Sequence, residues 1–114
     1  MSVSMDMCIN CTDLKKMMDE CSEEGSTVTL IDVRAPWEYE LCHIPGSLHM
    51  PLAHLSEHLD SIPRDRPIVT ICHHGVRSLQ GMRILLEAGF QDVKSLKGGI
   101  DAWSNQIDSS LQKY

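Results

Sequence analysis

The residues best suited to chemistry lie together in one hexapeptide, Cys72-His73-His74-Gly75-Val76-Arg77. It follows the apolar run 67–71 and precedes a helix-like stretch that starts at Ser78. A loop that passes from a strand into a helix can turn successive backbone N–H groups inward as an anion-binding nest, and the helix dipole adds positive potential. Arg77 adds a permanent positive charge. These surroundings favour a thiolate at Cys72, which is the attacking form of cysteine, so we expect nucleophilic sulfur chemistry on an anionic substrate.

The chain around this loop alternates between helical and strand patterns. A first helix is indicated by apolar residues at helical spacing, namely Leu14, Met17, Met18 and Cys21. Asn10 or Thr12 is a candidate N-cap, and the pair Gly25-Ser26 is expected to end the helix. Further helices are expected at 36–41, around Leu55, Leu59 and Ile62, from 78 to a C-cap at Gly89 with the stripe Leu79, Met82, Leu85 and Leu86, and around Ile100, Trp103 and Ile107. Strands are expected at 28–33, 48–50, 68–71 and 93–96.

Strands that are separated by helices need crossover connections, so the sheet should be parallel and covered on both faces. We therefore expect an α/β fold in three layers, with a mostly parallel central sheet of about five strands. Ligands of such sheets bind beyond the carboxyl ends of the strands. Cys72 follows the strand 68–71 directly and is predicted to lie at such an end.

The length and composition favour one domain over residues 1–114. Five cysteines and the absence of a basic or apolar leader pattern in residues 1–6 argue against a disulfide framework and favour a reducing cytoplasm. No apolar run is long enough to span a membrane. The net charge of −6 gives no support for binding nucleic acid or an anionic membrane surface. We expect no cofactor.

The other cysteines have weaker signals. Cys8 and Cys11 have the spacing of half a zinc site or a redox pair, but no second pair of ligands follows nearby. Chance spacing is the favoured interpretation, and no metal site is expected. Cys42 stands beside a turn that can approach the active loop, where it could act as a resolving cysteine. Trp37, Trp103 and the pair Met17-Met18 are interpreted as core residues.

In four ordered motifs the sequence resembles the single-domain rhodanese-like sulfurtransferases. The motifs are Leu30-Ile31-Asp32-Val33-Arg34 with Trp37-Glu38-Tyr39-Glu40; His43-Ile44-Pro45-Gly46-Ser47; Cys72 to Arg77 with Ser78; and Leu96-Lys97-Gly98-Gly99-Ile100 with Ala102-Trp103. Two positions depart from the family pattern. Cys42 stands where the family most often has glycine, and His73 replaces a frequent arginine, which makes part of the loop's charge depend on pH.

The resemblance implies a rhodanese-like three-layer sandwich and a persulfide relay. Cys72 would attack the outer sulfur of a donor such as thiosulfate and pass that sulfur to cyanide or a thiol, with Arg77 as an anion clamp. Substrate-binding residues would be His73, His74, Gly75, Val76, Ser78 and Arg34, and supporting residues would be Asp32 and His43. For Arg34 a structural role beside Asp32 is favoured over contact with substrate, and the side chains of His73 and His74 are interpreted as solvated loop residues whose backbones contribute N–H groups. Gly75 suits a tight loop that needs a positive φ or a close backbone approach.

Three other functions remain open. The related phosphatase and arsenate-reductase loops have five residues between cysteine and arginine, whereas this loop has four, which suits a single sulfur atom bonded to cysteine. A sulfur-relay carrier would deliver persulfide sulfur to a protein partner in cofactor or tRNA thiolation. A rhodanese-like binding or regulatory module would share the fold, although such modules typically lack the cysteine.

Overall fold

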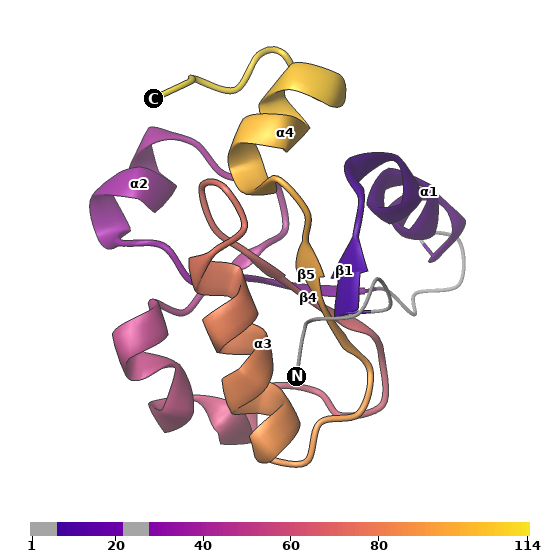
Figure 1. The fold of residues 1–114 in the computed structure, drawn as a ribbon, viewed down its shortest axis with the longest axis vertical. Coiled ribbons are helices and arrows are strands. Elements are labelled where there is room, and N and C mark those ends of the chain that lie inside the picture. The colour runs from indigo at the N-terminus through magenta and orange to yellow at the C-terminus, as the bar shows by residue number, and fades with distance from the viewer. Residues whose placement is uncertain (1–6, 22–27) are drawn as a thin grey trace.

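The computed structural model describes residues 7–21 and 28–114, without the side chains of residues 20 and 21. Its strands are Cys8–Ile9 (β1), Thr29–Asp32 (β2), Leu48–His49 (β3), Ile68–Ile71 (β4) and Val93–Leu96 (β5). They form one sheet in the order β1-β5-β4-β2-β3, and every neighbouring pair is parallel (Figure 1). The expected α/β fold with a parallel sheet of about five strands is confirmed.

The two central strands determine where the chemistry can lie. All residues of β2 and β4 are buried, as β-branched and apolar strands covered on both faces should be. Their register pairs Asp32 with Ile71, so both strands end at the same level of the sheet. The N–H of Val33 donates to the carbonyl oxygen of Ile71 at 2.9 Å. The residues that follow β2 therefore lie beside Cys72, which follows β4.

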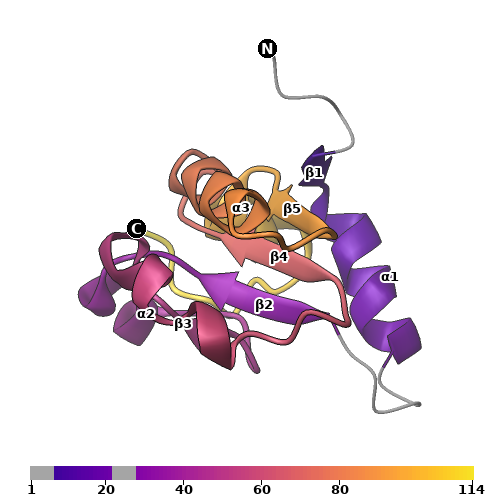
Figure 2. The same ribbon diagram turned by 90° about the horizontal axis from the view of Figure 1, so that it is seen from below.

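The helices cover both faces of the sheet and make the expected three layers (Figure 2). They are Cys11–Cys21 (α1), Pro36–Leu41 (α2), Arg77–Glu87 (α3) and Gly99–Gln106 (α4), with 3₁₀ turns at Leu52–Glu57 (η2) and Leu59–Ser61 (η3). On one face, Leu14 of α1 and Trp103 of α4 belong to one buried apolar cluster. On the other face, Leu55 of η2 and Leu85 of α3 belong to a second cluster. Helix α2 stands at the carboxyl edge of the sheet, near the C-terminal residues (Figure 1).

Alternation along β4 shows how one strand contributes to both clusters. Val69 and Ile71 face the α1 and α4 side, whereas Ile68 faces the α3 side. Cys72 continues this alternation and its side chain joins the α3 cluster. The two-residue period of the strand thus determines the face on which the sulfur lies.

Trp37 is not a core residue, contrary to the prediction. Its side chain is 61% exposed, whereas Trp103 is 3% exposed and belongs to the core as expected. Helix α2 has only six residues, and the residue that it buries is Glu38. Trp37 precedes Glu38 and points outward. Its ring packs against the ring of Tyr114 in an edge-to-face arrangement, with 5.6 Å between centroids.

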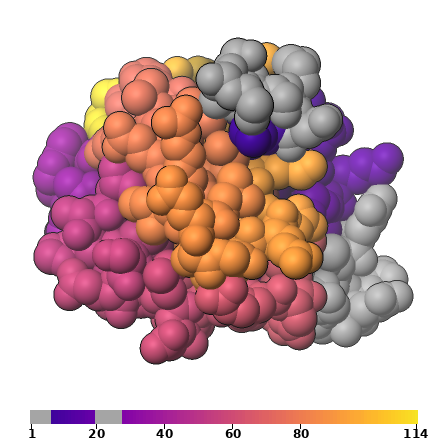
Figure 3. Space-filling model, turned by 60° about the horizontal axis from the view of Figure 1, so that its bottom comes forward, coloured from indigo at the N-terminus to yellow at the C-terminus, as the bar shows by residue number. Residues whose placement is uncertain are grey.

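The third helix expected around Leu55, Leu59 and Ile62 consists instead of the two 3₁₀ turns η2 and η3. Bonds between residues three apart run from the N–H of His58 to Leu55 and from the N–H of Ser61 to His58. Leu55 and Ile62 are nevertheless buried in the core, each three residues after a partly buried leucine, Leu52 and Leu59. The side chains of these turns lie next to those of α3 on one face of the molecule (Figure 3).

At the N-terminal end of the described chain, the structure adds a strand that the sequence did not predict. β1 has only two residues, Cys8 and Ile9, which pair with Ser95 and Leu96 of β5. A segment of two residues carries no readable alternation. The expected cap of α1 is confirmed, because Asn10 Oδ1 accepts a hydrogen bond from the N–H of Asp13 at 2.8 Å. The predictions for residues 1–6, for the side chain of Cys21 and for Gly25-Ser26 lie outside the described residues.

In the described ranges 7–21 and 28–114, every helix is too short or too polar to cross a lipid bilayer.

Candidate active site

Cys72 lies at the carboxyl end of β4, and the loop that it begins enters α3 at Arg77. Cys72 is 1% exposed. Its Sγ accepts a hydrogen bond from the backbone N–H of Gly75 at 3.0 Å. Gly75 has φ +102°, and a Cβ there would come within 3.4 Å of Leu96 O and 3.3 Å of Gly98 N. Glycine at this position therefore permits both the turn and its contact with the segment between β5 and α4.

Two buried serines extend the contacts of the sulfur into the protein. Cys72 Sγ and Ser78 Oγ are 3.4 Å apart, and Ser78 Oγ and Ser95 Oγ are 2.6 Å apart. Thr70 Oγ1 donates to the carbonyl oxygen of Ser78 at 2.7 Å. A hydroxyl can both donate and accept a hydrogen bond. Ser78 Oγ can therefore accept a hydrogen bond from the thiol of Cys72 or donate one to its thiolate, with Ser95 as its second partner. The apolar cluster around Cys72 therefore contains a small group of buried hydroxyls, each with a hydrogen-bond partner.

The start of α4 holds the first half of the loop. The N–H of Ile100 donates to the carbonyl oxygen of Cys72 at 2.8 Å, and that of Asp101 donates to the carbonyl oxygen of His73 at 3.0 Å. N–H groups in the first turn of a helix lack partners within the helix. Here the loop supplies those partners, and α4 in turn fixes the backbone of Cys72 and His73.

Arg77 forms a bidentate ion pair with Glu38 of α2. Arg77 Nη1 lies 2.6 Å from Glu38 Oε1, and Arg77 Nη2 lies 2.8 Å from Glu38 Oε2. The hydrogen bonds from Arg77 lower the pKa of Glu38 to about 2, against the opposing effect of burial and with further help from Tyr114 and the N–H of Ala35. The hydrogen bond with Glu38 raises the pKa of Arg77, and the charge on Cys72 adds to this rise. Glu38 thus binds both terminal nitrogens of Arg77 and fixes the orientation of its guanidinium.

Arg34 and Asp32 form a second ion pair, which is fully buried. Arg34 Nη2 donates to Asp32 Oδ2 at 2.7 Å and to the carbonyl oxygen of Cys42 at 2.6 Å, and Nη1 donates to the hydroxyl of Tyr114 at 2.7 Å. Burial opposes the charge of Arg34, but the hydrogen bonds to Asp32 and Tyr114 outweigh it and raise its pKa. This geometry fits the structural role for Arg34 and Asp32, and a contact of Arg34 with substrate stays a prediction.

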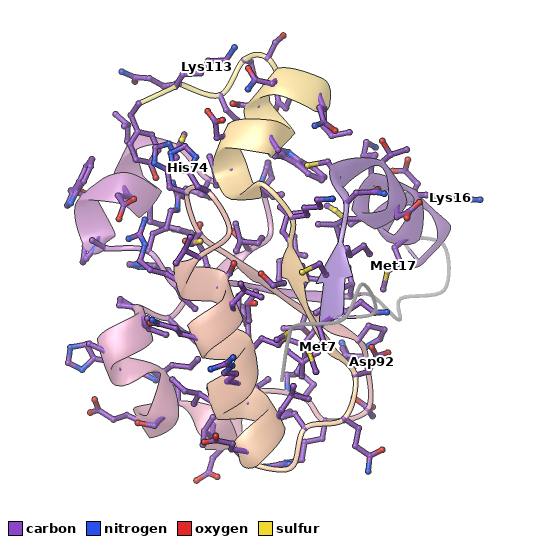
Figure 4. All side chains as sticks on the ribbon, in the orientation of Figure 1. Met7, Lys16, Met17, His74, Asp92 and Lys113 are labelled. Atoms are coloured by element: carbon purple, nitrogen blue, oxygen red, sulfur yellow. The ribbon has the colours of Figure 1, made fainter. Side chains whose placement is uncertain are left out.

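The two loop histidines stack on one another, with 4.0 Å between ring centroids. Burial and the neighbouring His74 lower the pKa of His73. His73 also stacks on Tyr114, with centroids 3.8 Å apart and rings 9° from parallel. The side chain of His74 is exposed and lies 4.0 Å from Asp101 Oδ2; it stands between α2 and α4 (Figure 4). Val76 is 67% exposed.

His43 belongs to a group of side chains that shapes the turn after α2. Its Nδ1 is 2.7 Å from the carbonyl oxygen of Tyr39, and its ring stacks on that of Tyr39 at 3.8 Å. The Tyr39 hydroxyl donates to the carbonyl oxygen of Ser47 at 2.7 Å. These contacts place His43 where a supporting role is expected.

The remaining described cysteines are free and belong to other surroundings. Cys42 and Cys11 lie in the cluster on the α1 and α4 face, whereas Cys72 lies in the cluster on the α3 face. A disulfide between Cys42 and Cys72 would need a rearrangement of one of them. Burial raises the pKa of Cys11, which disfavours its thiolate. In residues 7–21 and 28–114, no three His, Cys, Asp or Glu side chains are grouped to hold a metal ion.

Three residues of this site were not singled out from the sequence: Glu38, Ser95 and Tyr114. Glu38 stood in a quoted motif without a role, and Ser95 is an inward polar residue in the otherwise apolar end of a predicted strand. Tyr114 had no local signal. A cleft of about 370 Å³ also opens beside Arg77, with walls that come from α2 and η2 and include Pro36, Pro51 and Leu52.

Comparisons with known proteins agree on one family. A family model described as "Rhodanese-like domain" matches residues 10–106. The chain is 38% identical over 94 residues to "Probable adenylyltransferase/sulfurtransferase MoeZ" of Mycobacterium tuberculosis, covering 81% of this chain and 24% of that protein. It is 34% identical over 118 residues to "Adenylyltransferase and sulfurtransferase MOCS3" of Drosophila virilis, covering 93% and 24%. The chain thus spans about a quarter of the length of these relatives.

Among solved structures, a rhodanese-related protein from Thermoplasma volcanium superimposes with a TM-score of 0.76 at 29% identity. The match covers 88% of this chain and 92% of that one. The similarity therefore extends over nearly the whole of that structure.

Proposed function

Because the chain belongs to the family of rhodanese-like domains, we propose that it is a sulfurtransferase that carries sulfur as a persulfide on Cys72. The word sulfurtransferase in the names of its relatives supports the reaction class. The observation that carries the proposal is the hydrogen bond from the N–H of Gly75 to Cys72 Sγ, made in a four-residue loop between that cysteine and Arg77. A preorganised donor aimed at a sulfur anion stabilises it without reorganisation during the reaction.

In the first half-reaction, the thiolate of Cys72 attacks the outer sulfur of thiosulfate. A sulfur–sulfur bond forms to Cys72 Sγ as the bond between the two sulfurs of thiosulfate breaks. Sulfite leaves with the bonding electron pair, and Cys72 becomes a persulfide anion. No external oxidant or reductant is needed, because the donor already holds sulfur at the required oxidation level.

In the second half-reaction, cyanide or a thiolate attacks the outer sulfur of the persulfide. The new bond forms to that sulfur, the sulfur–sulfur bond to Cys72 breaks, and the electron pair returns to Cys72 Sγ. The thiolate is regenerated, and the product is thiocyanate or a persulfide of the acceptor. Two such steps with one covalent intermediate make a ping-pong reaction.

Each predicted site residue has a role in this proposal. The N–H of Gly75 and the hydroxyl of Ser78 stabilise the negative sulfur, with Ser95 holding the Ser78 hydroxyl. Arg77 acts as a positioned charge near the sulfur rather than as a free cation, because Glu38 binds both of its terminal nitrogens. The side chains and backbone of His73, His74 and Val76 form the entrance, and Asp32, Arg34 and His43 support the surrounding turns.

A protein acceptor is the second candidate for the sulfur, and exposed apolar side chains favour it. Val76 in the loop is 67% exposed, and Trp37 on α2, whose ring contacts Tyr114, is 61% exposed. Exposed apolar residues beside a reactive group are typical of surfaces that bind another protein. A carrier of this kind shares the first half-reaction and differs only in the acceptor.

The test is intact-mass spectrometry of the reduced and desalted protein after incubation with thiosulfate and then with cyanide. We expect a gain of one sulfur atom on Cys72, lost on addition of cyanide with formation of an equal amount of thiocyanate. Cys72→Ser should take up no sulfur, whereas the matched control Cys42→Ser should behave as the wild type.

Uptake by Cys72→Ser, or sulfur bound to a different cysteine, would contradict the mechanism. No uptake by the wild type, together with hydrolysis of an aryl phosphate, would favour the phosphatase alternative instead.

A further inference from the structure

Tyr114 contacts both ion pairs of the site, although it is separated from Arg34 by 80 positions and from Glu38 by 76. Its hydroxyl accepts a hydrogen bond from Arg34 Nη1 at 2.7 Å and donates one to Glu38 Oε2 at 2.8 Å. The directions are fixed, because a guanidinium has no acceptor and an ionised carboxylate has no proton to donate. One hydroxyl therefore joins the Asp32–Arg34 pair to the Glu38–Arg77 pair.

The ring of Tyr114 contacts the loop itself. It stacks on His73, the residue after Cys72, with 3.8 Å between centroids. The ring of Trp37 packs against the ring of Tyr114 in an edge-to-face arrangement, with 5.6 Å between centroids. Tyr114 and Leu111 also pack against the core cluster on the α4 face. The C-terminal segment runs from α4 back towards α2, above the loop between β4 and α3 (Figure 1).

These contacts act on opposite ends of one short loop. At its start, the ring of Tyr114 covers His73. At its end, the hydroxyl binds Glu38, whose carboxylate holds the guanidinium of Arg77 through both oxygens. The N–H of Gly75, which donates to Cys72 Sγ, lies between these two points. Fixing both ends of the loop limits the conformations in which that N–H can point away from the sulfur.

We propose that Tyr114 is a positioning residue for Cys72: it holds both ends of the loop so that the N–H of Gly75 stays aimed at the sulfur anion. The consequence for sulfur transfer rests on the function proposed above, whereas the effect on the thiolate does not. Burial, partly opposed by the hydrogen bond from Arg34, raises the pKa of Tyr114 to about 12, so its hydroxyl keeps its proton at neutral pH. The charged groups that face it are Arg34, Glu38 and, through Glu38, Arg77, and the titratable group that faces it is His73.

The test compares Tyr114→Phe, Tyr114→Ala and the control Lys113→Ala with the wild type. Lys113 is exposed and extends from the same segment (Figure 4). The first measurement is the rate of alkylation of Cys72 by iodoacetamide as a function of pH, followed by peptide mass spectrometry. The second is the single-turnover rate of persulfide formation with thiosulfate. Thermal unfolding of each variant shows whether it is folded at the assay temperature.

Tyr114→Phe keeps the stack on His73 and loses both hydroxyl contacts, so persulfide formation should slow about threefold, as expected for one or two weakened hydrogen bonds. Tyr114→Ala loses the stack on His73 as well as the two hydroxyl contacts, and persulfide formation should slow about tenfold or more. The midpoint pH of alkylation should rise in the same order, by about half a unit and about one unit. Lys113→Ala should match the wild type in both measurements.

An unchanged midpoint pH of alkylation in both Tyr114 variants would overturn the proposal. This holds even if the maximal alkylation rate changes, because a change in the maximal rate alone reports access to the sulfur. Lower thermal stability with unchanged midpoint and rate would also overturn it, since it would show a purely structural role. If the wild type forms no persulfide, the proposed function fails, and the alkylation profiles still decide the role of Tyr114.

Discussion

Glu38 receives four hydrogen bonds, which come from two nitrogens of Arg77, the N–H of Ala35 and the hydroxyl of Tyr114. It is only 4% exposed. A buried carboxylate is stable only when its oxygens are paired in this way. Its charge in turn holds Arg77 in one orientation next to the loop, with a bidentate geometry that a lysine could not reproduce.

This environment predicts how stability depends on pH. The folded-state pKa of Glu38 is about 2, below the ordinary value of 4.5, so its contribution is complete above pH 4.5 and is lost as the pH falls towards 2. Between pH 5.5 and 2.5, the free energy of unfolding of the wild type should fall by about 2–3 kcal/mol more than that of Glu38→Gln. Urea titrations at several pH values measure this difference.

Glu57→Gln is the matched control for that experiment, because Glu57 is exposed and pairs only with an exposed histidine in the described contacts. Its stability should follow the wild-type curve at each pH, since surface pairs contribute little. Parallel curves for Glu38→Gln and the wild type would show that Glu38 is not the stabilising carboxylate.

At the scale of the elements, the start of α4 and the Cys72 loop form one unit. The first turn of α4 binds the carbonyl oxygens of Cys72 and His73. Gly99, with φ +60°, lies so close to these two carbonyl groups that a Cβ would collide with their oxygens. This helix therefore approaches the loop as nearly as it does only because its first residue has no side chain.

Gly99→Ala should lower the free energy of unfolding by about 3 kcal/mol or more, because left-handed strain and overpacking add together. Gly46→Ala is the control: Gly46 has φ +88° but open space around its Cβ position. It should lose only about 1–2 kcal/mol, from strain alone. Urea unfolding gives both values, and persulfide loading of Cys72 should fall in Gly99→Ala but not in Gly46→Ala. Equal losses of stability would contradict the collision at Gly99.

At the scale of the whole molecule, two apolar cores share one sheet. The central strands supply side chains to both cores, so neither face can unfold without exposing the other. The radius of gyration is 13.1 Å, close to the value of about 13 Å for one compact domain of this length. We therefore infer that the described residues, 7–21 and 28–114, behave as a single cooperative unit.

Leu14→Ala in one core and Leu85→Ala in the other test this inference, because both side chains are fully buried. Each should lower the free energy of unfolding by about 2–5 kcal/mol. In each variant, tryptophan fluorescence and far-ultraviolet circular dichroism should still report one coincident transition in urea. Two separate transitions, or the loss of one core with the other retained, would show that the faces fold independently.

Much of this molecule could be read from local patterns in the sequence. Apolar spacing predicted α1, α3 and α4, the β-branched runs predicted β2 and β4, and Asn10 predicted the cap of α1. The loop from Cys72 to Arg77 was recognisable because its residues are consecutive. Such features depend on neighbours a few residues apart, so their periodicity is visible in the chain itself.

The tertiary structure alone decided the partners of the site. Arg77 binds Glu38 across 39 positions, Ser78 meets Ser95 across 17, and Tyr114 reaches Arg34 across 80. It also decided the outward position of Trp37, the two-residue strand β1 and the 3₁₀ form of η2 and η3. Each of these depends on tertiary contacts between segments that are distant in the sequence. Local propensity does not encode such contacts, because the free energy that selects them comes from burial and pairing between distant residues.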